Sequence, residues 1–221
     1  MNRGLNRLGI VALTAAAISM AACDEQTGVE MGGSASLSFA ATGGSTLLGD
    51  PTPPQNPVTV SGHVIAISRV ELQLSELEIE GEDSAEVEMK GGPLLVALPV
   101  NGTVVTPVTA TVIPGVYTEL EMKVNTVRIQ GTFDGQPFDV TVTVNEDLET
   151  DIRPPLVVTE TTQANLTVAI QISNWFRNED GSAIDLRNLT TTGRSRLASN
   201  INTSFDAFED DDRSGSSHDD D

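Results

Sequence analysis

Apolar and polar residues alternate with a period of two over much of this chain, and this alternation limits the folds open to it. Residues 138–144 read Phe-Asp-Val-Thr-Val-Thr-Val, and residues 166–172 read Leu-Thr-Val-Ala-Ile-Gln-Ile. Successive side chains of a β-strand point to opposite faces of the sheet, so each run would have one apolar face. The pattern predicts strands with one face in a core and the other face in solvent.

Turn signals separate these runs and indicate how the strands connect. Asp134-Gly135 lies between two β-rich segments, Val127–Phe133 and Phe138–Val144. Such a pair favours a type I′ hairpin, because both central positions need a positive φ. Short strands with frequent turns, and no alternation of strands with helices, are typical of two packed antiparallel sheets. The sequence therefore predicts an all-β fold, specifically an antiparallel β-sandwich.

The last part of the chain has a different pattern. Leu197, Ile201, Phe205 and Phe208 recur at helical spacing. This spacing predicts one short C-terminal helix that packs its apolar stripe on the sheet. Residues 209–221 are almost wholly acidic or small, which predicts a disordered acidic tail.

The N-terminus has the three parts of an export signal. Arg3 and Arg7 provide a basic start, an apolar stretch follows over Leu8–Ala17, and Met20-Ala21-Ala22 precedes Cys23. The apolar stretch is too short to span a bilayer. We expect residues 1–22 to be a signal peptide that is cleaved between Ala22 and Cys23.

The residues around the cleavage position resemble the lipobox of bacterial lipoproteins, with Met20 in place of the usual leucine. The resemblance implies that Cys23 receives a diacylglycerol and becomes the acylated, palmitate-bearing N-terminus. Stable anchoring needs more than one acyl chain. An ordinary secretory signal followed by a chance cysteine is the alternative. Lipidation predicts a protein of the bacterial cell envelope that faces the periplasm or the cell exterior, and it leaves the membrane and leaflet open.

Charge limits the partners of the mature chain. The full chain has a net charge of −20, and cleavage would remove Arg3 and Arg7 but no acid. Such a charge disfavours nucleic acid and anionic membrane surfaces. We therefore expect attachment to the membrane through the lipid alone, with residues 23–33 as a tether and residues 34–208 as the β-sandwich domain.

The sequence contains no recognisable set of residues for nucleophilic catalysis. The one cysteine, Cys23, would be consumed by lipidation, and the two histidines are His63 and His218. A nucleophilic triad needs a histidine held by a carboxylate, and nothing in the sequence points to one. We expect no enzymatic activity and no cofactor besides the covalent lipid.

The acidic tail contains one pattern with metal-binding chemistry. Asp210, Asp212, Ser214 and Gly215 match the start of a calcium loop, and Asp221 falls at its final position. Calcium prefers several clustered oxygen ligands. The final ligand is Asp rather than Glu, no helix follows, and a run so rich in Asp matches by chance. A solvated tail is the alternative to this calcium site.

Three stretches carry a resemblance to a known family. They are Val64–Leu72 with its continuation to Glu80, the apolar segment Gly92–Leu98, and the turn and strand of Ile113–Leu120. Together they resemble domain-of-unknown-function family 4382 of bacterial lipoproteins, over roughly residues 34–176. The resemblance implies a sandwich of the prealbumin-like or immunoglobulin-like kind and carries no catalytic residues.

Three hypotheses for function follow. The first is a lipid-anchored envelope lipoprotein with a non-catalytic binding or structural role, for which a protein or glycan partner stays open. The second is a carbohydrate-binding or carbohydrate-active module, assisted by calcium. The third is an assembly or chaperone-like lipoprotein.

Overall fold

The computed structural model describes residues 32–42, 57–81, 86–100, 103–161 and 163–211. These residues form nine strands, one 3₁₀ turn and one α-helix. The elements are β1 (Gly33–Thr42), β2 (Pro57–Val60), β3 (His63–Gly81), β4 (Glu86–Leu98), β5 (Val104–Val112), β6 (Gly115–Phe133), β7 (Gln136–Val158), β8 (Gln163–Gln171), η1 (Ile172–Asn174), α1 (Thr191–Asn202) and β9 (Phe205–Glu209).

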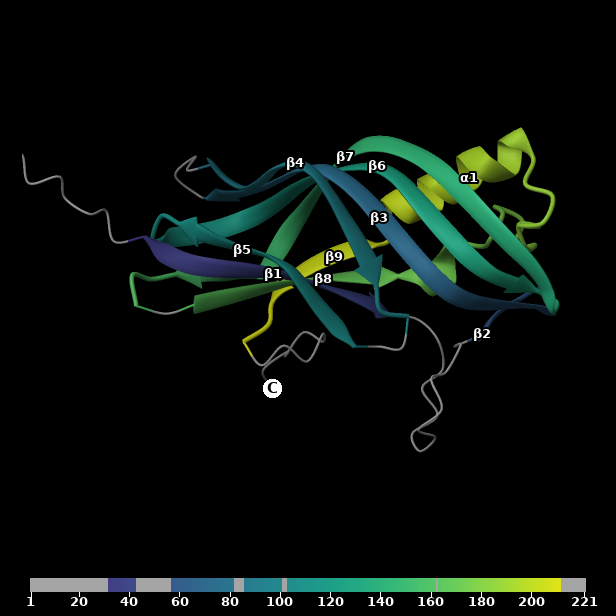
Figure 1. Ribbon diagram of the computed structural model, residues 1–221, viewed down its shortest axis with the longest axis horizontal. Helices are drawn as coiled ribbons and strands as arrows, with labels where there is room; N and C mark the ends of the chain where they lie inside the picture. Colours follow the sequence, from purple (N-terminus) through teal and green to yellow (C-terminus); the bar gives the residue numbers. More distant parts are fainter. Residues whose placement is uncertain (1–31, 43–56, 82–85, 101–102, 162, 212–221) are drawn as a thin grey trace, which may run out of the picture. The chain divides into compact units, whose positions relative to one another are not determined.

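Three long antiparallel strands, β3, β6 and β7, form the largest part of the sheet (Figure 1). The β3–β6 register runs from Ile65↔Phe133 to Gly81↔Tyr117. The alternating residues determine which face is buried: the inner row of β7 includes Val140, Val142 and Val144, as the alternation predicts. β2 and β4 both pair with β3, on the side away from β6.

The remaining strands continue the same sheet in the order β7-β9-β8-β1-β5. β1 pairs with β8 in parallel, and β7 pairs with β9 in parallel at Ile152↔Ala207. The prediction of a wholly antiparallel sheet was therefore wrong for these two pairs. β1 lies far from β8 in the sequence, so the register of the β1–β8 pair comes from long-range packing, which a local alternating pattern does not encode.

The result is a mostly β unit with one mixed sheet curled into a half-barrel. The predicted sandwich of two separate sheets is not confirmed. β7 pairs with β6 along most of its length and with β9 at Ile152, so it joins β3 and β6 to the β9-β8-β1-β5 part in one sheet. The core lies on the inner face of the curl. Its largest fully buried side chains include Trp175, Tyr117, Phe39, Phe133 and Phe176.

The predicted hairpin at Asp134-Gly135 is confirmed. Phe133 pairs with Gln136, which leaves two residues in the loop. Asp134 has a φ of 49° and Gly135 a φ of 77°, as a type I′ turn requires.

β5 is the last strand at the other side of the sheet. There Pro107 falls in an irregular stretch, where Val105 and Val108 of β5 pair with Phe39 and Leu37 of β1.

The one short C-terminal helix is confirmed, but the predicted stripe is only half helical. Leu197 and Ile201 are buried on α1, whereas Phe205 and Phe208 lie on β9. β9 pairs with β8 through Ile170↔Phe205 and neighbouring residues. Helical spacing alone did not distinguish these four residues, because pairing with β8 overrides local preference.

Several predicted features lie outside the described residues. These are the signal peptide, the cleavage site at Ala22 and Cys23, most of the tether, and residues 212–221 of the predicted tail. Three residues of the predicted tail are described: Glu209 belongs to β9, Asp210 is buried and Asp211 is exposed. Among the helices that the structure describes, none has the length and apolar character to cross a bilayer.

The close contact between β3 and β6 at Gly131 leads to a prediction about the stability of a glycine variant. A Cβ added at Gly131 would overlap the backbone carbonyl oxygen of Ala66, whereas one at Gly115 would find its nearest neighbour at an ordinary 3.7 Å. Gly131→Ala should therefore destabilise the protein by about 2 kcal/mol, and Gly115→Ala by much less. Chemical denaturation followed by the fluorescence of Trp175, the one tryptophan and fully buried, measures both. Equal midpoints for the two variants would contradict this account of the β3–β6 contact.

Candidate binding groove

Helix α1 begins at a capped N-terminus and packs through a narrow apolar stripe. Thr190 is the N-cap, and its side chain accepts a hydrogen bond from the Gly193 backbone N–H at 3.1 Å. Such a cap satisfies one of the backbone donors that the first turn leaves unpaired. Leu197 and Ile201 are the buried residues of the helix. Only one side of α1 is therefore used for packing, which leaves other positions to face a groove.

The C-terminal end of α1 is held by a partly buried polar network. The Trp175 indole Nε1–H donates to Ser204 Oγ at 2.7 Å, and that hydroxyl donates to the Ile201 carbonyl at 2.7 Å. Asn200 Nδ2 donates to the carbonyls of Trp175 and Arg177, at 2.9 and 2.8 Å. Trp175 is thus both core residue and hydrogen-bond donor. The network fixes the last turn of α1 relative to the segment that follows β8.

Strand β7 contributes a carboxylate to its inner, mostly apolar row. Glu146 pairs with Val124, which is fully buried, and cross-strand partners share a face of the sheet. Between this pair and Thr126↔Thr143, two residues of β7 oppose one of β6, and Asn145 has a φ of 49°. This is the geometry of a β-bulge. Sequence reasoning missed Glu146, although it occupies the next alternate position after Val144.

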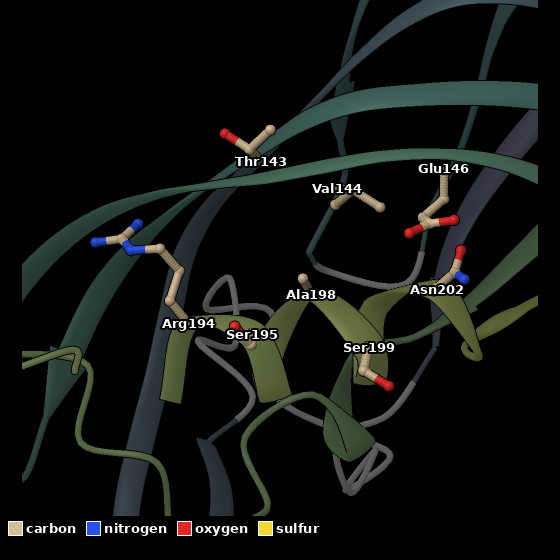
Figure 2. Close-up of a pocket in the computed structure, with 8 residues that line it drawn as sticks. All are labelled: Thr143, Val144, Glu146, Arg194, Ser195, Ala198, Ser199 and Asn202. Carbon is tan, nitrogen blue, oxygen red and sulfur yellow. The ribbon is translucent and has the colours of Figure 1, made fainter. Parts of the chain in front are cut away.

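A groove of about 390 Å³ lies between α1 and β7. Figure 2 shows Val144 and Glu146 pointing from β7 toward the helix, and Ala198 and Asn202 pointing back toward the strand. The full lining is Thr143, Val144, Glu146, Arg194, Ser195, Ala198, Ser199 and Asn202. Six of these eight residues are polar, and Val144 and Ala198 are the apolar ones.

Asn202 leaves one hydrogen-bond acceptor unused. Its side-chain oxygen, Oδ1, is buried and has no hydrogen-bond partner among the residues that the structure describes. A buried polar atom without a partner costs free energy, and native proteins contain few of them. A ligand that donates a hydrogen bond to this oxygen would remove the cost.

The acceptors of the groove and its one cationic side chain therefore lie at opposite ends of the lining. Glu146 and Asn202 provide acceptors close to each other (Figure 2), and Ser195 and Ser199 lie along the helix. Arg194 lies at the other end, where its guanidinium donates to the Thr141 carbonyl. This arrangement suits a small neutral or cationic molecule with hydroxyl or amine donors. Its lining consists largely of hydroxyl, amide, carboxylate and guanidinium side chains, which offer hydrogen bonding.

The candidate calcium residues are only partly described. Asp210 is 2% exposed, and its carboxylate Oδ2 accepts a hydrogen bond from Thr167 Oγ1 at 2.8 Å. Its backbone N–H donates to the Asn165 carbonyl at 2.9 Å. Asp210 thus secures the end of β9 against β8. Asp212, Ser214 and Asp221 lie outside the described residues, and the calcium site stays a prediction.

A histidine held by a carboxylate exists, although nothing in the sequence pointed to one. His63 Nδ1 lies 2.7 Å from Asp134 Oδ2, and the Val64 N–H donates to the other carboxylate oxygen at 2.9 Å. The hydrogen bond with His63 is the main cause of the lowered pKa of Asp134. Ser61, on the adjacent turn, donates its hydroxyl to the Gly181 carbonyl at 2.7 Å. That serine proton is directed away from the imidazole, so these contacts do not assemble a nucleophilic triad.

The outer face of the sheet carries a dense group of carboxylates, the acidic ladder. It runs across four strands and consists of Glu76, Glu78 and Glu80 of β3, Glu86 and Glu88 of β4, Glu119 and Glu121 of β6, and Asp147, Glu149 and Asp151 of β7. Lys123 lies within it and donates to Asp147 Oδ1 at 2.7 Å. Within the described part of the chain, no three acidic, histidine or cysteine side chains are grouped as metal ligands.

Comparisons of the chain with protein-family models, curated protein sequences and solved structures found no match.

The acidic ladder predicts a pH-dependent stability. Burial raises the pKa of Glu78 from 4.5 to about 7, with further contributions from the hydrogen bond and charge of Glu86 and from the charges of Glu76 and Glu121. The folded state thus holds this proton more tightly than the unfolded state does, so stability rises as pH falls from about 7 to 4.5. Glu78→Gln should raise stability above pH 7 by ~1 kcal/mol, allowing for solvent screening, and flatten this dependence.

The measurement is thermal unfolding of both proteins across this pH range. Glu160→Gln provides the control, because Glu160 is exposed and outside the ladder. An unchanged pH profile in the Glu78→Gln variant would refute the assignment of the titration to Glu78.

Proposed function

We propose that this chain is a lipid-anchored protein of the bacterial cell envelope whose β domain has a non-catalytic binding role. The observation that carries the anchor is the position of the one cysteine, Cys23, directly after Met20-Ala21-Ala22. That sequence follows a basic start and an apolar stretch of signal-peptide length. We also propose, as the family resemblance implies, a prealbumin-like sandwich. In it, the part of the sheet formed by β3, β6 and β7 would face the part formed by β9, β8, β1 and β5.

The groove between α1 and β7 supports the binding role. It combines an unpartnered buried oxygen on Asn202 with a carboxylate on Glu146, and both are placed by rigid elements. The Trp175–Ser204 network and the cap at Thr190 hold α1 in place. Sites on fixed helices and strands keep their geometry better than sites on loops. The ligand class that fits is a small molecule with several hydrogen-bond donors.

A carbohydrate is the second candidate, favoured by the acceptors of the groove. Sugar hydroxyls would donate to Asn202 Oδ1 and to the Glu146 carboxylate. Stacking on the two large polar aromatics is unavailable, because Trp175 and Tyr117 are 0% and 1% exposed. Recognition in the groove would therefore rest on hydrogen bonds. Assistance by calcium would need the tail residues Asp212, Ser214 and Asp221, because Asp210 already bonds Thr167.

The anchor predicts the behaviour of a Cys23 variant. Cys23→Ala should abolish labelling of the protein by palmitate in bacterial cells and release it from the membrane fraction, because the thiol is the acceptor of the lipid. Thr27→Ala, four residues further on, should keep both the label and the location. Membrane association of Cys23→Ala equal to that of the unaltered chain would disprove the anchor.

The groove predicts the behaviour of two further variants. In a glycan array, Asn202→Ala and Glu146→Ala should weaken binding to any sugar that the unaltered protein retains, by about five- to tenfold for each lost hydrogen bond. Asn202→Ala should not lower the unfolding midpoint, since the oxygen that it removes has no partner among the described residues. Asp206→Asn, on the exposed side of β9, is the matched control.

Either of two results would rule out the carbohydrate. One is an array that shows no binding by the unaltered protein. The other is binding that both groove variants leave intact.

A further inference from the structure

We infer that the end of the domain where the chain enters β1 carries an apolar tip that contacts the lipid bilayer. The tip consists of Ile113, Val116 and Val157. This inference rests on the proposed lipid anchor. It departs from the expectation that the lipid alone contacts the membrane, because it assigns a membrane-contact surface to the polypeptide and a direction to the domain.

The tip residues are the exposed apolar residues of one end of the sheet. Ile113 is 59% exposed, Val157 is 50% exposed and Val116 is 40% exposed. Val116 and Val157 are register partners on β6 and β7, so their side chains share the outer face. Ile113 lies three residues before Val116, and its carbonyl accepts a hydrogen bond from the Tyr117 hydroxyl at 2.7 Å. Exposed apolar residues that cluster in this way mark contact surfaces.

The chain from Cys23 enters the sheet at this same end. Gly33, the first residue of β1, pairs with Val112, which precedes Ile113. A Cβ at Gly33 would overlap Val158 and the Thr159 carbonyl, so the β7 terminus lies directly against the entry point. Gly115 pairs with Val158, which brings the start of β6 to the same place. All three tip residues therefore surround the point where the anchored segment joins the fold.

The length of the connecting chain keeps this end close to the membrane. Eight residues, 24–31, separate Cys23 from Gly32, and even a fully extended chain of that length reaches only about 30 Å. By contrast, β6 has 19 residues, which extend over roughly 60 Å of strand to the hairpin at Asp134. The entry end is thus confined near the bilayer, whereas the hairpin end is free to project away from it.

Charge favours contact through the tip rather than through a side of the domain. The acidic ladder covers the outer face of β3, β4, β6 and β7, beginning at Glu119 and Asp151 just beyond the tip. Lying on that face would bring its carboxylates against the headgroups, and the chain as a whole carries a net charge of −20. An upright domain places the three apolar residues at the headgroup boundary and keeps the ladder in water.

Tryptophan scanning with brominated lipid tests this orientation. The full lipidated protein is placed in phosphatidylcholine vesicles whose acyl chains are brominated near the headgroup, so that bromine quenches indole at that depth. Ile113→Trp and Val157→Trp report the tip, and two positions guard against misfolding of one variant. Val64→Trp is the matched control, because Val64 is 45% exposed beside the Asp134 hairpin at the other end. The buried Trp175 supplies the same background in all three.

The expected result is quenching at 113 and 157 at least about twofold stronger than at 64, in a protein that floats with the vesicles. Flotation with equal quenching at the two ends, or with tip fluorescence that bromine does not affect, overturns the inference while leaving the anchor intact. Burial of the tip against a second copy would give this last outcome. Failure to float, together with absence of palmitate labelling, overturns the anchor and the inference with it.

Discussion

The continuous antiparallel pairing of β3, β6 and β7 is the constraint on which the rest of the structure depends. These strands exchange backbone hydrogen bonds over nearly their full lengths. Most of their apolar residues point to one face, so pairing in this register creates the surface that the other elements must cover. β1, β8 and β9 curl around to cover part of it, and α1 covers another part with Leu197 and Ile201. A slip of one residue would turn the apolar row outward and remove the reason for the curl.

The candidate groove arises where this regular pairing is interrupted. The bulge at Asn145 and the change to Glu146 interrupt the apolar row of β7, which resumes at Leu148. A polar residue at an inner position would be costly if α1 packed tightly against it. The helix instead leaves a polar groove, and its last turn is held by Trp175 and Ser204 rather than by contact with β7 at this point. The same irregularity thus supplies polar groups that line the groove.

Local patterns predicted the strands and the hairpin well, because alternation and an Asp-Gly pair act within a few residues. Contacts between distant parts of the sequence were beyond their reach. His63 and Asp134 are 71 positions apart, and the pair depends on the β2–β3 turn meeting the β6–β7 turn. The parallel pairing of β1 with β8 has the same origin. Phe205 and Phe208 fit a helix by spacing alone, and only the presence of β8 as a partner makes them a strand. Of the groove residues, Glu146 could have been identified in the sequence as a break in the alternation. Asn202, which lies near it in the folded chain, has no such sequence signal.

Pro107, in the irregular part of β5, affects whether this strand could pair with the same strand of an adjacent molecule. β5 is the last strand in the order of the sheet, so one of its edges offers backbone groups that no described strand uses. Proteins held on a membrane meet one another in two dimensions, where neighbours are frequent and similarly oriented. Under those conditions an open strand edge would template pairing from molecule to molecule. Pro107 lacks the backbone N–H that a pairing strand would use, and prolines within sheets are typical of edge strands. If the chain is held on a membrane as proposed, Pro107 would make β5 a poorer template for pairing between adjacent copies.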